Sequence, residues 1–166
     1  MSRDTLLRFA DQVQGAAAES VPGPSPEHHL VTFALDREEF GIPVKQVREV
    51  IRVGEITRVP EAPPHVRGLI NLRGRILPVV ELRTRIGLTV AEITPHSRIL
   101  VVESQGRVLG ILVDAVLRVE KVPTSTVAPV PDEVLSPHAD YILGVARWNS
   151  RLIIMLELEK VLLLQD

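Results

Sequence analysis

Histidines, cysteines and paired carboxylates build most catalytic and metal sites, and this sequence offers few of them. There is no cysteine, which excludes disulfides, thiolate metal sites and thiol nucleophiles. The histidines are His28, His29, His65, His96 and His138. All five lie in proline-rich or loop-like surroundings, only the first two are near each other, and no carboxylate at helical i, i+4 spacing completes a metal site. The sequence therefore predicts no metal centre and no catalytic residue.

The signatures of other chemistry are also missing from the sequence. It contains no glycine-rich phosphate loop, the usual motif for nucleotide binding, and no Gly-x-Ser-x-Gly motif, the usual motif for acyl transfer. The net charge is −2, with charges of both signs interspersed, so no single-signed field attracts nucleic acid. Aromatic residues make up only 3% of the chain, whereas single-strand-binding barrels stack bases on aromatic side chains. We expect no enzyme activity, no cofactor and no nucleic-acid partner.

Composition predicts one folded domain outside the membrane. A chain of 166 residues with 45% apolar content can build a packed core. The N-terminus lacks the basic start and continuous apolar run of a signal peptide. Apolar runs such as 152–156 are far shorter than the ~20 residues of a membrane span. We expect a cytoplasmic protein that does not insert directly into the membrane.

The first 29 residues differ from the rest of the chain. Residues 2–19 place Leu6, Phe9 or Ala10, and Val13 at helical spacing, and the prolines of 22–26 then break regular structure. The pattern predicts a short helix and a flexible linker over 1–29. Two interpretations remain for this segment: a docking peptide that folds on contact, or an extension that packs loosely or frays.

From Leu30 the pattern changes to short runs of branched and aromatic residues separated by turn residues, which predicts a mostly β fold. The predicted strands are 30–35, 38–42, 47–53, 67–72, 75–80, 98–104, 107–112, 115–122, 142–148 and 151–156. Each half of this series ends in a short predicted helix, at 81–86 and at 157–164.

The two halves repeat each other. With an offset of 69 residues, Gly41-Ile42 falls on Gly110-Ile111, and four valines with the same spacing also coincide. With an offset of 76 residues, Gly68 falls on Gly144 and Glu81-Leu82 on Glu157-Leu158. The offset grows across 123–138, a proline- and serine-rich stretch predicted to be a loop. The chain is therefore a duplicated unit.

Five short strands leave long exposed edges in an open sheet, and closure into a small barrel removes them. We therefore predict two tandem five-stranded barrels within 30–164: a first barrel of about 30–88, a second of about 98–156, and a C-terminal helix at 157–164. Pro78 indicates an edge or a bulge, because proline donates no hydrogen bond to a strand ladder. The seam between the barrels is a ready groove for a partner.

The stretch Asn71-Leu72-Arg73-Gly74 predicts a hairpin turn with Asn71 and Gly74 as its turn residues. Arg73 has two interpretations. It is either a solvated turn residue or the partner of Glu49 in a partly buried ion pair. A regular strand would place Glu49 on the same face as Val47 and Ile51.

At this point the sequence resembles a known family, the CheW-like adaptors of bacterial chemosensory arrays. The resemblance is carried by 33–35 with 39–42, by Val47-Arg48-Glu49-Val50, by the long run 68–83, and by 110–114. It implies two five-stranded Src-homology-3-like barrels without enzymatic activity. It also implies two partners: the regulatory domain of a CheA-like histidine kinase, and the cytoplasmic tip of a methyl-accepting chemoreceptor. The expected location is cytoplasmic, at membrane-bound receptor arrays.

The positions that match the family's receptor-binding groove are Val47, Glu49, Val50, Arg73, Ile99, Gly110, Val116 and Val119. For the valines, membership of the barrel core is the competing interpretation. The resemblance assigns no kinase-facing residues, because 89–97 and 123–138 fall in variable segments of the family. Two other functions stay open: a CheW-like scaffold of a chemosensory system unrelated to chemotaxis, and a small nucleic-acid-binding barrel.

Overall fold

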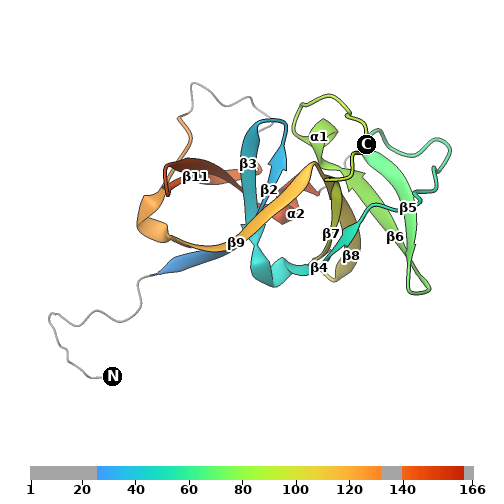
Figure 1. The fold of residues 1–166 in the computed structure, drawn as a ribbon, viewed down its shortest axis with the longest axis horizontal. Helices are drawn as coiled ribbons and strands as arrows, with labels where there is room; N and C mark the ends of the chain where they lie inside the picture. Colours follow the sequence, from blue (N-terminus) through green and yellow to red (C-terminus); the bar gives the residue numbers. More distant parts are fainter. Residues whose placement is uncertain (1–25, 132–139, 163–166) are drawn as a thin grey trace, which may run out of the picture. The chain divides into compact units, whose positions relative to one another are not determined.

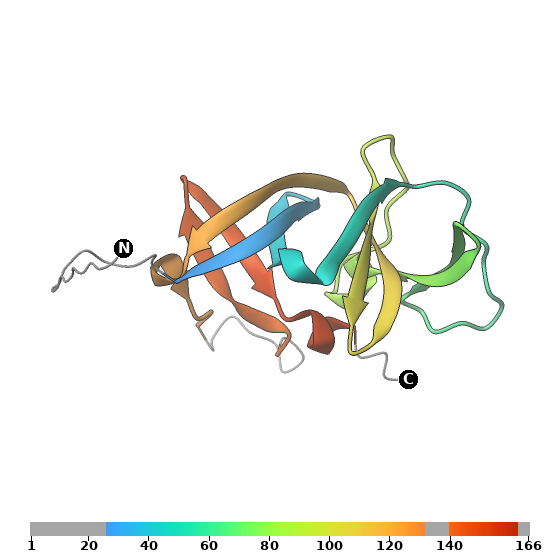
Figure 2. The same cartoon turned by 90° about the horizontal axis from the view of Figure 1, so that it is seen from below.

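The computed structural model describes residues 26–131 and 140–162. The predicted N-terminal helix and linker therefore lie outside the described residues, apart from the last few positions. The compact unit that carries both sheets comprises His28–Val122 and Thr126–Asp166. The mostly β fold is confirmed, and Figures 1 and 2 show its curved strands from two directions.

Every strand predicted from the sequence is present. The elements in chain order are β2 (Glu27–Leu35), β3 (Glu38–Pro43), η1 (Val44–Gln46), β4 (Val47–Arg52), β5 (Val66–Leu72), β6 (Arg75–Glu81), α1 (Leu82–Arg85), β7 (Arg98–Ser104), β8 (Arg107–Val113), β9 (Ala115–Pro123), η2 (Thr124–Thr126), β10 (Val127–Ala128), β11 (Ile142–Trp148), β12 (Arg151–Leu156) and α2 (Leu158–Val161). The two short helices follow β6 and β12, as the repeat predicts. Among the described residues, the two-residue strand β10 and the single-turn helices η1 and η2 were not predicted.

The strands form one sheet in the order β4-β7-β8-β6-β5 and another in the order β10-β11-β12-β3-β2-β9. The predicted division into a barrel of 30–88 and a barrel of 98–156 is therefore wrong, because each sheet takes strands from both repeats. The N-terminal hairpin of one repeat, β2–β3, joins β12 of the other, and the hairpin β7–β8 joins β6. These two junctions are parallel pairs, which a hairpin alone cannot form.

The exchange of hairpins obeys the internal repeat. In one junction Met155 lies opposite Gly41, and in the other Val79 lies opposite Gly110. Gly110 follows Gly41 at the offset of 69, and Met155 follows Val79 at the offset of 76, so the two junctions are equivalent. The duplication holds in three dimensions, although neither copy forms a sheet by itself.

In each sheet, the chain that follows one edge strand pairs with a strand at the opposite edge, so the sheet curves toward closure. After β4, Thr57 forms a two-way hydrogen-bonded bridge with Leu69 of β5, with both N···O distances at 2.8 Å. After β9, the strand β10 pairs with β11 in the equivalent way. Glycine is required at these closures: a Cβ on Gly68 would lie 2.3 Å from the Thr57 carbonyl oxygen, and its φ of 152° disfavours other residues.

Pro78 was expected at an edge or a bulge. Its strand β6 instead lies between β5 and β8. However, the pairing of β6 with β8 begins only at Val79, so Pro78 belongs to the part of the strand that pairs with β5 alone. The missing N–H of proline is tolerated for that reason.

Three apolar clusters hold the fold together. A small cluster lies inside the five-stranded sheet and includes Ile70, Val79 and Ile99. Another lies inside the six-stranded sheet and includes Leu30 and Ile153. The largest cluster is shared by both sheets, with members from β2, β3, β6, β7, β8, β12 and α2. Burial of apolar surface in this shared cluster joins the sheets into one unit.

Candidate functional site

The hairpin between β5 and β6 has the predicted turn. Arg73 and Gly74 both adopt positive φ, 52° and 84°, and Asn71 accepts a 2.9 Å hydrogen bond from the Gly74 N–H through its Oδ1. Such turns favour glycine and asparagine, which reach the left-handed region at low cost. The equivalent turn between β11 and β12 has Asn149 and Ser150 with φ of 53° and 63°.

The turn aims Arg73 at β4. Its Nη2 lies 2.6 Å from Glu49 Oε1 and its Nη1 lies 2.8 Å from Oε2, so the guanidinium binds the carboxylate through two parallel hydrogen bonds. These hydrogen bonds lower the pKa of Glu49; burial opposes them, and the charge of Arg73 adds to them. The pair joins the two edge strands of the five-stranded sheet. Arg73 is both a turn residue and an ion-pair partner, and its side chain remains 70% exposed.

Strand β4 contains an irregularity between Val47 and Glu49, two of the predicted groove residues. It changes which side chains of the strand share a face. Val47 pairs with Val102, but Glu49 pairs with Val101, so the register shifts by one residue around Arg48. Because side chains alternate along β7, Val47 and Glu49 project to opposite faces. The expectation that they share a face is wrong.

The shifted register gives β4 two faces with different surroundings. Val47 packs against the core shared by both sheets, and Val50 lies on the same face with 43% of its surface exposed. Glu49 shares its face with Ile51, which packs against the interior of the five-stranded sheet. The apolar positions and the ion pair therefore belong to different faces of this strand.

Strand β9 supplies the other predicted valines. Val116 packs against the shared core, as Val47 does, and Val119 is 62% exposed. Leu117 beside it is 41% exposed. Exposed branched residues of this kind on an edge strand are candidates for contact with a partner.

Ile99 and Gly110 are not surface residues. Ile99 has no exposed surface, and a Cβ built on Gly110 would lie 2.7 Å from the Ile99 Cγ2 atom. Both lie inside the five-stranded sheet, behind β4, where Ile99 pairs with Ile51. They shape the sheet from within, so a partner cannot touch Ile99 directly.

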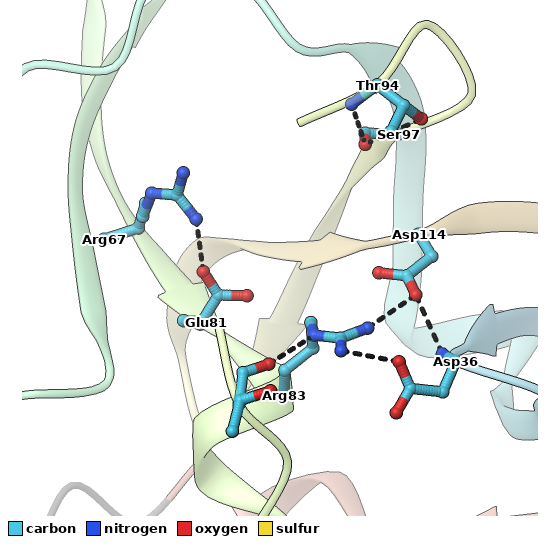
Figure 3. A network of polar contacts seen from close by, with 8 residues as sticks. Asp36, Arg67, Glu81, Arg83, Thr94, Ser97 and Asp114 are labelled. Carbon is cyan, nitrogen blue, oxygen red and sulfur yellow. Dashed lines mark hydrogen bonds and ion pairs between the residues drawn. The ribbon is translucent and has the colours of Figure 1, made fainter. Parts of the chain in front are cut away.

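The sequence did not point to three further polar clusters. Arg83, Asp36 and Asp114 form a network beside α1, drawn in Figure 3. Next to it, Arg67 pairs with the buried carboxylate of Glu81. On the other sheet, Arg151 binds Glu39 with an Nε–Oε1 distance of 2.9 Å and also binds Glu120. These clusters join segments far apart in the sequence, so no local spacing reveals them.

A cavity of about 520 Å³ lies beside the β2–β3 turn. Its apolar lining comes from distant segments: Phe40, Ile86, Leu88, Tyr141, Ile142 and Ile154. Burial raises the pKa of the Tyr141 phenol; the charge of Arg85 opposes this effect, and that of Asp140 adds to it. The charged residues Asp36, Arg37 and Glu38 of the β2–β3 turn complete the lining.

Within 26–131 and 140–162, no three histidine or carboxylate side chains are grouped to hold a metal ion. In the same part of the chain, no helix is long and apolar enough to cross a membrane. The described arrangement offers contact surfaces and fixed ion pairs.

Comparison with known proteins gives consistent matches over most of the chain. The family model described as "CheW-like domain" matches residues 29–165. The chemotaxis protein CheW of Rhizobium meliloti is 36% identical over 132 residues, which cover 80% of this chain and 85% of that protein. CheW of Helicobacter pylori is 29% identical over 162 residues, 98% of each chain. The crystal structure of the scaffolding protein TtCheW from Thermoanaerobacter tengcongensis matches with a TM-score of 0.72 and 34% identity, over 79% of this chain and 89% of that one.

Proposed function

Because the chain belongs to the CheW-like domain family, we propose that it is a non-enzymatic adaptor that couples methyl-accepting chemoreceptors to a CheA-like histidine kinase in chemotaxis. The family match over 29–165, which takes in both sheets, carries this proposal. The adaptor would act at the cytoplasmic face of membrane-bound receptor arrays.

The receptor tip would bind as a helix along the exposed valines of β4 and β9. Val50 and Val119 present apolar surface to solvent, while Val47 and Val116 anchor the same strands to the shared core. Helices that bind in grooves place apolar side chains at i, i+3, i+4 and i+7 against such surfaces. The pair Glu49–Arg73 would shape the flank of this site by holding the β5–β6 turn against β4.

Ile99 and Gly110 would contribute indirectly. They pack behind β4 and set the position of that strand, so changes there would alter receptor binding through the shape of the sheet.

The adaptor would transmit a signal by holding two partners at once. A receptor shift changes the relative stability of kinase conformations only if both contacts persist in a fixed relation. The kinase regulatory domain is expected to resemble this family itself and to pair with it barrel to barrel.

The experiment measures binding of the purified chain to a receptor cytoplasmic tip and to a kinase regulatory domain by calorimetry. Val50→Asp and Val119→Asp should each weaken receptor binding about tenfold or more, since each places a charge in an apolar contact. Val90→Asp is the matched control, because Val90 is 58% exposed and lies in the loop between α1 and β7. A wild-type chain that binds neither partner would overturn the proposal.

A further inference from the structure

Arg83 is the most deeply buried arginine among those for which an ion pair is described. It is the second residue of α1, directly after Leu82, which is fully buried in the core shared by the sheets. Only 7% of the Arg83 side chain is exposed. A guanidinium is always charged at physiological pH, so this burial demands partners for its donors.

Its partners come from three separate segments, as Figure 3 shows for the two carboxylates. Arg83 Nη2 lies 2.5 Å from Asp36 Oδ1, and Nη1 lies 2.7 Å from Asp114 Oδ2. Arg83 Nε donates a 2.7 Å hydrogen bond to the Thr89 carbonyl. A planar donor group held on three sides has one orientation only.

Backbone hydrogen bonds also connect Asp114 to the β2–β3 hairpin. The Asp36 N–H donates to Asp114 Oδ2 at 2.8 Å, and the Asp114 N–H donates to the Ala34 carbonyl at 3.0 Å. Asp114 thus binds both the β2–β3 hairpin and Arg83. Removal of any one side chain leaves at least one hydrogen-bonding group of another member without its partner.

The network connects the two sheets. Arg83 follows β6 of the five-stranded sheet, and Asp36 lies in the turn between β2 and β3 of the six-stranded sheet. Asp114 lies where the chain passes from β8 in the first sheet to β9 in the second. We name these three residues, Asp36, Arg83 and Asp114, the inter-sheet lock.

The lock adds directional contacts between the sheets, which the shared apolar core does not provide. Apolar burial is non-directional, so the core holds the sheets together but discriminates weakly between small rotations or slips. Charge-assisted hydrogen bonds of a rigid guanidinium fix both distance and direction. The lock therefore adds a directional contact between the sheets to the apolar core that they share.

The duplication provides an internal comparison. At the repeat offsets, Arg83 corresponds to Glu159, Asp36 to Gln105 and Asp114 to Lys45. Among the described residues no ion pair joins Lys45 to Glu159, and Lys45 is exposed. The equivalent position in the other repeat thus carries no lock.

We propose that Arg83 is a positioning residue that locks the two sheets in one orientation, and that this lock is required for a receptor signal to reach the kinase. The second clause rests on the proposed adaptor function. The lock touches neither the exposed valines of β4 and β9 nor the Glu49–Arg73 pair. Loss of the lock should therefore impair signal transfer while the affinities for the receptor and the kinase stay unchanged.

The first test measures the sheet orientation in the free chain. Because the sequence has no cysteine, Arg107→Cys and Arg147→Cys introduce two unique spin-label sites, one on each sheet. Both positions are exposed. The lock predicts a narrow distance distribution that broadens in Asp36→Ala and in Arg83→Lys, which keeps the charge but loses the planar fork. Glu159→Gln is the matched control and should leave the distribution narrow.

Asp36→Ala keeps the test informative if Arg83 variants fail to fold, because the Asp36 side chain is 48% exposed and its removal leaves the core intact. A distribution that stays narrow in both Asp36→Ala and Arg83→Lys would overturn the lock. This outcome is independent of any partner.

The second test uses receptor-containing membranes, full-length kinase and the unlabelled variants. Asp36→Ala should leave both binary affinities unchanged and reduce the stimulus-dependent change in kinase activity about fivefold or more, the size of a typical coupling between sites. An unchanged kinase response with a broadened distance distribution would refute the signalling role. Failure of the wild-type chain to bind either partner would instead refute the proposed function, while the distance measurement would still decide the lock.

Discussion

Gly110 provides the sharpest test of how the interior of the five-stranded sheet is packed. A Cβ at this position would lie 2.7 Å from the Ile99 Cγ2 atom, closer than two carbon atoms can approach without a shift. Ile99 is β-branched, so its Cγ2 cannot swing away by rotation of a distant bond. Gly110→Ala therefore forces β8 or β7 to move within a fully buried core.

Two effects set the magnitude. Overpacking of a buried site costs about 1–3 kcal/mol. Replacement of glycine by alanine in a strand returns roughly 0.5–1 kcal/mol by reducing the flexibility of the unfolded chain. With the middle of each range, the net loss is about 1 kcal/mol, a decrease in Tm of about 2–4 °C for a domain of this size.

The duplication supplies the control for this measurement. Gly41 is the equivalent residue, but its Cβ would meet the Leu30 Cδ1 at 3.1 Å and the Ile153 Cγ2 at 3.2 Å. These contacts are looser, and the Leu30 methyl is the end of a flexible side chain, so Gly41→Ala should lower Tm less than Gly110→Ala. Ile99→Leu removes the branch at Cβ and should partly rescue Gly110→Ala in a double-mutant cycle. Equal thermal stability of Gly110→Ala and Gly41→Ala would refute this reasoning.

The remaining predictions concern pH and the N-terminal segment. The pKa of Glu49 is lower in the folded chain than its ordinary 4.5, so the stability that the Arg73 pair contributes is complete above that value and is lost as pH falls through the lowered pKa. The Tm difference between wild type and Glu49→Gln should therefore shrink as the pH falls below 4.5; a difference that stays constant throughout the acid range would contradict this. Tyr141 is the only tyrosine, and burial raises its pKa, so an ultraviolet titration should show a single midpoint above 10; a midpoint at or below 10 would show a solvated phenol. Deletion of residues 1–25 should leave one cooperative thermal transition at an unchanged Tm, and loss of that transition would show that this segment belongs to the core.

Local pattern was sufficient for the strands. Alternation and turn residues predicted all strands of five residues or more, because each is bounded by residues that terminate a ladder. The hairpin at Asn71–Gly74 followed from the need for positive φ at consecutive positions. These are properties of neighbouring residues, which a sequence displays directly.

Pairing between strands was beyond the same reasoning. The repeat shows that two copies exist, and two arrangements of them are possible. Each copy can close on itself, or the copies can exchange their hairpins. Both arrangements bury equivalent residues. The sequence pattern is identical for both, since Gly41 and Gly110 meet a strand of the same type either way. Only the connection lengths and three-dimensional packing distinguish them.

The candidate site was predicted in composition but not in geometry. A regular β4 would place Val47 and Glu49 together, and one extra residue around Arg48 separates them. A bulge of this kind has no obligatory residue type in the sequence. For the same reason, Ile99 and Gly110 could be matched to a functional groove although they lie in the core.

The two copies have similar backbones but different ion pairs and hydrogen bonds between side chains. In the first copy, Glu49 of β4 binds Arg73 of the β5–β6 turn. At the repeat offset, Glu49 corresponds to Arg118 of β9, so the second copy has a cation where the first has a carboxylate. There Arg118 lies 3.7 Å from Glu39, and Asn149 of the turn donates to Glu120.

The ends of the molecule are therefore similar in shape and different in charge pattern. Discrimination between two partners requires such differences, since a symmetric molecule would bind either partner equally well at either end. Under the proposed function, the diverged ion pairs of the duplicated fold would let the adaptor distinguish a receptor from a kinase. Exchange of the pair, as in Glu49→Arg with Arg73→Glu, should preserve the closure of the first sheet and weaken binding of the receptor tip, because the pair flanks the proposed receptor site. Unchanged binding would show that the charges of this pair do not contribute to recognition.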